Sequence, residues 1–275
     1  MNRFYKKPNP KVEKKNDRKK ERKLREQNLY APRFEDLEGE MRLNRFIALA
    51  GICSRRDADV LIRKGKVQLN GKVVTELGIK VTPGKEKVVY NGKELRVQRF
   101  VYLLMNKPKN QIVNTKDDRG RDTVMELVGK YTKTRVYPVA RLDRNATGLL
   151  LFTNDGEMAK KLTHPSHEIK KLYQVKLNKE LEEADFHQLK KGVDLEDGQI
   201  KASKVSYIEG STLNEVAIQL TSDRNRVVRR MFEHLGYQVD ALDRVGFGPL
   251  TKKKLPRGTC RFLEEKEVGF LRMLK

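Results

Sequence analysis

The segment "ARLDRNATGLLLFTNDG", from Ala140 to Gly156, has a carboxylate between two arginines, followed by a strongly apolar run. The carboxylate is Asp143, and the apolar run extends from Leu149 to Phe152. Consecutive large apolar residues bounded by turn residues favour a buried strand. Asp143 can be a turn residue, because aspartate often bonds nearby backbone. It can equally be a catalytic acid, because neighbouring guanidinium groups favour its ionised form. The spacing alone leaves these two interpretations equal.

The chain on both sides of this segment predicts one large domain over residues 100–275. The run "FVYLLM", from Phe100 to Met105, is typical of a strand, and the Asn-Lys-Pro sequence after it indicates the strand's end. Because strands outnumber helices, we expect an α+β domain with a mainly antiparallel mixed sheet flanked by helices. Further strands are predicted at Lys171–Leu177, Ile200–Ile208 and Asn214–Thr221, and helices at Glu180–Lys191, Arg224–Leu235 and Lys266–Leu274.

Residues 41–99 predict a smaller unit of two helices and a β-hairpin. Apolar residues at positions 43, 46, 47 and 50 form one helical stripe that ends at Gly51. Ser54 followed by Asp57 predicts a capping box at the start of a second helix, which ends at Gly65. The dipeptide Asn70-Gly71 lies between alternating apolar residues and predicts a tight hairpin turn.

The sequence "MRLNRFIALAGICSRRDADVLIRKGKVQLNGKVV" resembles an S4 RNA-binding domain. A helix-turn-helix DNA-binding module also has two helices near a glycine turn, but it does not need a hairpin directly after the second helix. The resemblance implies a basic surface for structured RNA. The residues expected on this surface are Arg42, Arg45, Ser54, Arg55, Arg56, Lys64 and Asn70.

Four further motifs stand in the order found in the RsuA/RluB/RluE/RluF-type pseudouridine synthases, which join an S4 domain to a catalytic domain. They are "LLMNKPKN", "RLDRNATGLLLFTNDG", "KLYQV" and "RNRVVRRMFEHLGYQVDALDRVGFGPL". The resemblance extends from about Met41 to the C-terminus and is closest to the members that modify large-subunit rRNA. It implies that Asp143 is the essential catalytic residue, with Tyr173 and Arg229 as the other active-site residues.

The chemistry implied by this resemblance explains why these residue types are needed. Isomerisation of uridine breaks the bond from N1 to C1′ and rejoins the base through C5, so the base must leave the stack. Tyr173 offers a ring for stacking and a hydroxyl for proton transfer, and Arg229 is expected to pair with Asp143. Without the resemblance, Tyr173 would be interpreted as a core residue and Arg229 as a solvated or phosphate-binding one. Further RNA contacts are expected from Lys107, Arg141, Leu142, Arg226 and Arg230.

Ala140 departs from the family pattern, because the residue before the RLD motif is commonly glycine in these enzymes. An alanine is strained only if its φ is positive, and a negative φ would be harmless.

Other candidate sites are weaker. His164 and His167 surround a proline without an acid cluster, which favours a polar loop over a metal site. Asp117, Asp118 and Asp155 could be the acids of a two-metal nuclease, but they lie in turn sequences, which favours a structural role. No phosphate-binding loop is visible, so no metal ion and no cofactor are implied. Cys53 and Cys260 have no CxxC partner and are expected to be reduced, buried thiols.

The net charge of the chain indicates the class of molecule that it binds. The 275 residues include 60 Lys and Arg against 37 Asp and Glu, which gives a formal net charge of +23. A charge of this size favours nucleic acid as the partner. A membrane surface is the rival, but no apolar run approaches the roughly 20 residues of a span and no signal peptide is visible, so we expect a cytoplasmic protein. Residues 1–40 predict a disordered basic arm, either an RNA tether or a solubilising tail.

The expected function is conversion of uridine to pseudouridine in ribosomal RNA. The target expected is 23S rRNA or a ribosome assembly intermediate, with 16S rRNA as the alternative. A non-catalytic S4-type assembly factor is the alternative from another class. No dimerisation heptad is visible, so a monomer is expected.

Overall fold

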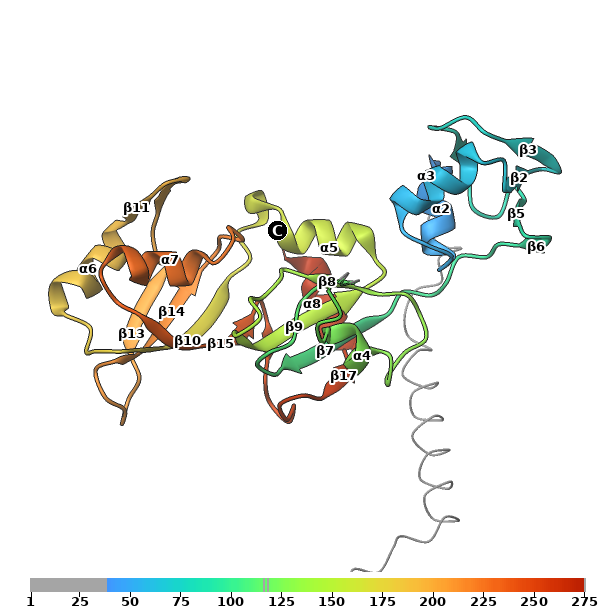
Figure 1. Cartoon of the computed structure of the whole chain (residues 1–275). Coiled ribbons are helices and arrows are strands. Elements are labelled where there is room, and N and C mark those ends of the chain that lie inside the picture. Colours follow the sequence, from blue (N-terminus) through green and yellow to red (C-terminus); the bar gives the residue numbers. More distant parts are fainter. Residues whose placement is uncertain (1–38, 116, 118, 275) are drawn as a thin grey trace, which may run out of the picture. The chain divides into compact units, whose positions relative to one another are not determined.

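The computed structural model describes residues 39–274 except 116 and 118. The described chain forms two compact units, which meet in the sequence between Phe100 and Val101, one residue after the expected position (Figure 1). Most of the expected basic arm, residues 1–38, lies outside the described residues. No helix in the described part is long and apolar enough to cross a membrane.

The first unit has the predicted order of helix, helix and hairpin. Its helices are α2 (Leu43–Leu49) and α3 (Arg55–Arg63). A four-stranded sheet has the order β3-β2-β5-β6, and a short strand β1 pairs with β4. The strand bounds are Met41–Arg42 (β1), Val67–Leu69 (β2), Lys72–Val74 (β3), Lys80–Val81 (β4), Val88–Tyr90 (β5) and Lys93–Glu94 (β6).

Local sequence signals in this unit act as expected. The Ser54 hydroxyl accepts a hydrogen bond from the Asp57 amide at 3.1 Å, and together the two residues form the predicted capping box. Asn70 and Gly71 have φ values of 52° and 82°. Both are positive, as a type I′ hairpin turn requires. The predicted helix start and hairpin are therefore confirmed.

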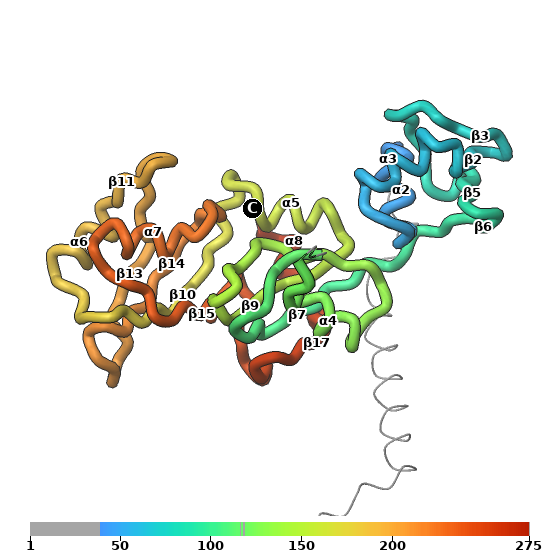
Figure 2. Tube along the Cα trace, in the orientation of Figure 1, coloured from blue at the N-terminus to red at the C-terminus, as the bar shows by residue number. Residues whose placement is uncertain are grey.

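The second unit is built on a nine-stranded sheet, whose main path has the order β13-β14-β10-β15-β9-β7-β17. Strand β8 pairs with β9 and β16 with β15. Near the C-terminus the chain returns to place β17 beside β7 (Figure 2). The bounds are Tyr102–Lys107 (β7), Tyr137–Val139 (β8), Thr147–Thr153 (β9), Lys171–Leu177 (β10), Lys204–Tyr207 (β13), Glu215–Leu220 (β14), Val239–Phe247 (β15), Leu250–Thr251 (β16) and Cys260–Phe262 (β17).

Helices lie beside both halves of this sheet, and the two halves differ in burial. Helices α5 and α8 lie beside the β9 half, while α6 and α7 lie beside the β10 half (Figure 1). All seven residues of β9 are buried, whereas buried and exposed residues alternate along β10. The α+β expectation is confirmed. The helix bounds are Val124–Val128 (α4), Gly156–Thr163 (α5), Glu183–Lys191 (α6), Val227–His234 (α7) and Glu265–Met273 (α8).

A short parallel seam joins the two halves. Strand β9 pairs with β15 through Thr147 opposite Asp243 and Gly148 opposite Arg244. Gly148 has a φ of +106°, and a Cβ at this position would lie 2.2 Å from the Arg244 carbonyl oxygen. Only glycine therefore fits at this point of the seam.

The structure also corrects several expected bounds. The strand expected at Ile200–Ile208 is divided, because β12 (Gly198–Ile200) turns back to form a hairpin with β11 (Val193–Leu195) before β13 begins. Helix α7 begins three residues later than expected, because Arg226 has a left-handed φ of 50°. Cys260 is buried as expected, but Cys53 is only half-buried.

Candidate active site

Asp143 lies in the loop between β8 and β9, and the backbone of this loop is tightly turned. The Ala146 amide donates to the Asp143 carbonyl oxygen at 3.2 Å. Ala140 has a φ of 52°. This is the strained case, because the Cβ of an L-residue crowds the backbone in the left-handed region. The loop that contains Asp143 therefore begins at a residue with a strained backbone.

Two arginines of the α7 region face the Asp143 carboxylate. The Nε of Arg229 lies 3.5 Å from Oδ2, and the Nε of Arg226 lies 4.0 Å from the same oxygen. Arg229 is 13% exposed, and its Nη1 donates to the Val239 carbonyl oxygen at 2.7 Å, which fixes its orientation. The structure therefore brings Arg229 to Asp143, as the family resemblance implies.

Arg141 and Arg144 flank Asp143 in the sequence, and this spacing indicates that they neutralise its charge. The structure pairs Asp143 with other arginines. Among the ion pairs of the described residues, those of Asp143 are with Arg226 and Arg229, and not with Arg141 or Arg144. The ion-pair partners of the carboxylate therefore come from the α7 region, distant in sequence. Arg141 is exposed and Leu142 is buried, and both border the same cavity as Asp143.

Tyr173 also lines this small cavity. It lies on β10 with its side chain directed inward. The cavity volume is about 40 Å³. Arg226 borders this cavity, and its side chain is 53% exposed.

Lys107 is not available to RNA phosphate, contrary to the expectation. Its side chain is fully buried. The ammonium donates to the carbonyl oxygens of Pro108 at 3.0 Å, Arg144 at 2.9 Å and Ala146 at 2.8 Å. All three donors are thus used, and two of them hold the loop directly after Asp143. Burial lowers the pKa of Lys107 to about 8, and the negative charge of Asp143 opposes this shift.

Two other buried cations near Tyr173 were not predicted from the sequence. Arg244 on β15 is fully buried, and its Nε donates to the Leu149 carbonyl oxygen at 2.7 Å. Lys171 on β10 is also buried and pairs with Asp223 at 2.8 Å. The alternation of β10 could have indicated Lys171, because it has the same parity as Tyr173 and therefore faces the same side of the sheet.

Arg230 has partners within the protein. Its guanidinium donates to Asp197, on the turn of the β11–β12 hairpin, at 2.9 Å and to the Asn225 carbonyl oxygen at 3.0 Å. The hydrogen bond from Arg230 lowers the pKa of Asp197. Arg230 therefore fixes this hairpin to α7. Arg226 also contacts Glu233 at 3.3 Å, but it remains the more exposed of the two arginines.

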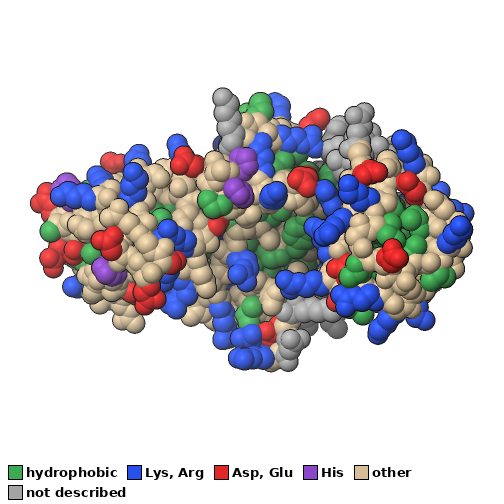
Figure 3. Space-filling model, turned by 90° about the horizontal axis from the view of Figure 1, so that it is seen from above, with side chains coloured by type: hydrophobic (Ala, Val, Ile, Leu, Met, Phe, Trp, Pro, Cys, Tyr) green, Lys and Arg blue, Asp and Glu red, His purple; other side chains and the backbone are tan. Residues whose placement is uncertain are grey.

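The cations of the first unit are oriented differently. Most of the residues expected to contact RNA have exposed side chains, and Lys and Arg side chains are visible across the face drawn in Figure 3. Ser54 and Arg45 are half-buried, and Ser54 serves as the helix cap. The exposed residues are Arg42, Arg55, Arg56, Lys64 and Asn70.

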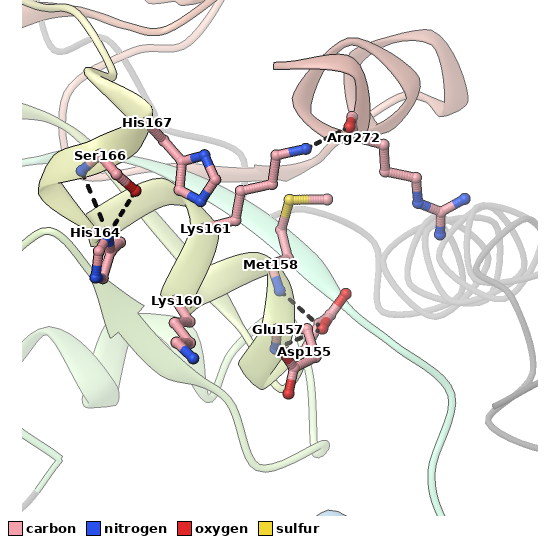
Figure 4. Close-up of a pocket in the computed structure, with 9 residues that line it drawn as sticks. All are labelled: Asp155, Glu157, Met158, Lys160, Lys161, His164, Ser166, His167 and Arg272. Carbon is pink, nitrogen blue, oxygen red and sulfur yellow. Dashed lines mark hydrogen bonds between the residues drawn. The ribbon is translucent and has the colours of Figure 1, made fainter. Parts of the chain in front are cut away.

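A larger hollow of about 590 Å³ lies between α5 and α8 (Figure 4). Its polar groups hold helix ends. Asp155 accepts from two amides at the start of α5, and the Lys161 ammonium donates to the Arg272 carbonyl oxygen. His164 bonds Ser166 at 2.7 Å within its own turn. No group of three His, Cys, Asp or Glu side chains in the described part could hold a metal ion. This hollow is larger than the cavity at Asp143 but lacks its chemistry.

Known proteins with similar sequences identify the family to which this chain belongs. Ribosomal large subunit pseudouridine synthase B of Bacillus subtilis strain 168 is 42% identical over 236 residues, which cover 85% of this chain and 96% of that protein. This chain belongs to the RNA pseudouridylate synthase family. The family's sequence model matches residues 101–234, and the S4 domain model matches residues 41–87.

Other relatives agree with membership of this family. An uncharacterized RNA pseudouridine synthase of Aquifex aeolicus strain VF5 is 37% identical, covering 84% of this chain and 94% of that protein. Ribosomal large subunit pseudouridine synthase B of Pasteurella multocida strain Pm70 is 35% identical, covering 86% and 71%. A crystal structure of a pseudouridylate synthase superposes with a TM-score of 0.60 at 26% identity, covering 84% of this chain and 99% of that one. The expected pseudouridine synthase is thereby confirmed.

Proposed function

We propose that this family member converts uridine to pseudouridine in large-subunit ribosomal RNA, with Asp143 as the catalytic carboxylate. The relatives from B. subtilis and P. multocida are named as large-subunit enzymes, which supports the choice of RNA. The pairing of Asp143 with Arg229 beside Tyr173 supports the choice of residue. This pairing is the observation on which the proposal depends.

Asp143 acts on a uridine that has left the RNA stack. Unstacking costs a few kcal/mol, which contacts with the protein must offset. The carboxylate is 24% exposed, so it is reachable from the cavity mouth while Arg229 holds it from the side of α7. An ionised acid with a fixed guanidinium partner is suited to attack or proton abstraction at the sugar or the base.

Tyr173 is the second residue of the proposed active site. Its ring forms part of the wall of the cavity, where a uracil can stack against it. Its hydroxyl is the group assigned to proton transfer. Burial raises the pKa of Tyr173, so the phenol keeps its proton at neutral pH until a reaction partner accepts it.

RNA is held by the first unit and by the mouth of the cavity. The exposed cations of α3 and of the hairpin are assigned to phosphate contacts, and Arg141 and Arg226 to the flanking nucleotides. The N-terminal segment is assigned to non-specific attraction, since residues 1–25 carry twelve Lys or Arg and three acids. We also propose that the enzyme works as a cytoplasmic monomer, on free RNA or on an assembly intermediate.

The decisive experiment maps pseudouridines in ribosomal RNA from cells with the gene, without it, and with the Asp143→Ala variant. The matched control is Asp194→Ala, because Asp194 is an exposed acid on β11. We expect one or more large-subunit pseudouridines to require the gene, to be absent with Asp143→Ala and to be present with Asp194→Ala.

Purified Asp143→Ala protein should bind the target RNA within a few-fold of the unaltered protein, because the phosphate contacts remain. Identical pseudouridines in all four samples would contradict the enzyme and leave the S4-type binding factor. Loss confined to 16S rRNA would keep the enzyme and overturn the large-subunit target.

A further inference from the structure

Arg244 and Tyr173 are directly opposite each other on neighbouring antiparallel strands. Residue 173 of β10 pairs with residue 244 of β15, next to a register shift between Leu172 and Tyr173. Side chains that are opposite in an antiparallel pair lie on the same face of the sheet. Both side chains are buried, while Leu172 and Gln174 are exposed, so this shared face is the inner one.

The surroundings of Arg244 are unusual for a buried cation. It is 1% exposed, and its Nε is bonded to the Leu149 carbonyl oxygen. Its Nη2 is buried without a hydrogen-bond partner. No ion pair within the described part of the chain includes Arg244, and the nearby acid Asp223 pairs with Lys171 instead. The guanidinium carbon lies 5.2 Å from the centroid of the Phe247 ring, and a buried charge without an acidic partner costs stability.

The positive charge of Arg244 acts on the phenol. Burial raises the pKa of Tyr173, and the Arg244 guanidinium opposes this shift. The carboxylates of Asp223 and Asp143 act in the opposite direction. Arg244 is thus the group that favours negative charge on the Tyr173 oxygen.

We propose that Arg244 is a positioning residue for Tyr173, which orients the hydroxyl and stabilises the oxygen after its proton has moved to the reacting nucleotide. This inference rests on the proposed function of Tyr173. The competing role is a structural one, in which Arg244 only ties β15 to β9 through Leu149. If Arg244 positions Tyr173, removal of the guanidinium slows the reaction. If Arg244 is only structural, its removal lowers the stability and leaves the rate unchanged.

The first experiment compares the full-length Arg244→Met variant with Arg261→Met. Arg261 is a partly buried arginine in the same unit that pairs with Glu267 on α8 and lies outside the cavity lining. We expect Arg244→Met to slow single-turnover pseudouridine formation by about tenfold to a hundredfold, at or below the low end of a general acid–base contribution, without lowering the melting temperature. Arg261→Met should lower the melting temperature and leave the rate unchanged.

A lower melting temperature for Arg244→Met with an unchanged rate overturns the proposal. Rate and stability falling together calls for the Arg244→Lys variant, which keeps the charge but loses the planar guanidinium. We expect Arg244→Lys to recover at least half of the lost factor on a logarithmic scale. Recovery of none of it also overturns the proposal.

A double-mutant cycle with Tyr173→Phe tests whether the effect passes through the hydroxyl. We expect Arg244→Met to have no additional effect on the rate once the hydroxyl is absent. An equal slowing in both backgrounds would mean that Arg244 acts independently of Tyr173, which excludes the positioning role.

A spectroscopic measurement separates this inference from the proposed function. Tyr173 is replaced by a fluorinated tyrosine, a more acidic phenol, and its fluorine NMR signal is followed against pH in the whole protein without RNA. We expect the titration midpoint to lie at higher pH in the Arg244→Met background. An unchanged midpoint refutes the inference even if the enzyme is active. A shifted midpoint in a protein that forms no pseudouridine would leave the pairing intact and refute only the function.

Discussion

The second unit buries several of its basic residues, whereas most of those expected to bind RNA in the first unit are exposed. In the first unit Arg42, Arg55, Arg56 and Lys64 extend into solvent. In the second unit Lys107, Lys171 and Arg244 are almost completely buried. Exposed cations attract phosphate over a distance set by salt. Buried cations are screened much less and act on a few defined neighbours. A high positive charge therefore describes two separate functions, RNA binding and construction of the site.

Removal of the Lys107 charge should have the largest effect among the variants that test this comparison. Lys107→Met leaves three carbonyl oxygens without their donor, so we expect a loss of about 3 kcal/mol in the free energy of unfolding and a large loss of activity. Urea denaturation measures the stability. The exposed control Lys64→Met should change it by less than about 0.5 kcal/mol. Equal effects of the two variants would contradict the division.

The second prediction concerns pH, because the pKa of Lys107 lies at about 8. Above this pH the amine loses a donor to the loop and its charge beside Asp143, so the rate should fall by about tenfold per pH unit. Stability should respond with the opposite sign. Between pH 8 and the ordinary lysine pKa of 10.5, the unfolded chain binds more protons, so the contribution of Lys107 to the free energy of unfolding rises with pH.

Rates from pH 7 to 10 measure this effect, with RNA binding followed separately. In Lys107→Arg the guanidinium stays charged over this range, so the alkaline fall should move to higher pH. A fall that is the same in both proteins would assign it to another group.

The third prediction tests the exposed cations. In Arg55→Gln/Arg56→Gln the slope of log affinity against log salt should decrease by about 0.7 to 0.9 for each phosphate that the protein no longer neutralises. The rate at saturating RNA should not change. The control Lys179→Gln/Lys190→Gln removes the same charge from lysines that lie over Tyr237 and Phe186 in the second unit, and its slope should stay constant. Equal slopes for both pairs would mean that net charge alone attracts the RNA.

The smallest expected effect is at Ala140. Ala140→Gly removes the Cβ that crowds a φ of 52°, at the cost of a more flexible unfolded chain. We expect a net gain of about 0.5 to 1 kcal/mol in the free energy of unfolding. Ala159→Gly on α5 should instead lose about 1 kcal/mol. A decrease at both positions would show that Ala140 is not strained.

The sequence predicted those features that depend on neighbouring residues. The capping box at Ser54, the turn at Asn70 and the strand at Lys171–Leu177 depend on local sequence, and each is present in the structure. The pairing of Asp143 with Arg229 followed from family resemblance and not from spacing, because it joins residues far apart in the chain.

The buried cations could not be predicted in the same way. Lys107 stands beside a proline and other polar residues, which is typical of an exposed loop. Its burial arises because the β8–β9 loop returns over the end of β7, and the carbonyl groups of that loop replace water around the ammonium. Arg244 gives no local signal, since its neighbours come from β9 and β10. Sequence shows which residues carry charge, while the fold decides which of them water reaches.

The parallel seam between β9 and β15 has a mechanical consequence. Asp143 precedes β9, whereas Tyr173 belongs to β10 on the other side of the seam, so the acid and the phenol are mounted on different halves of the sheet. These halves meet at two residue pairs, and Gly148 allows the backbones to approach there. The distance between these two side chains therefore depends on the local twist of the sheet. A methyl group at position 148 would push the backbones of β9 and β15 apart. It would thereby separate Asp143 from Tyr173 without contacting either side chain.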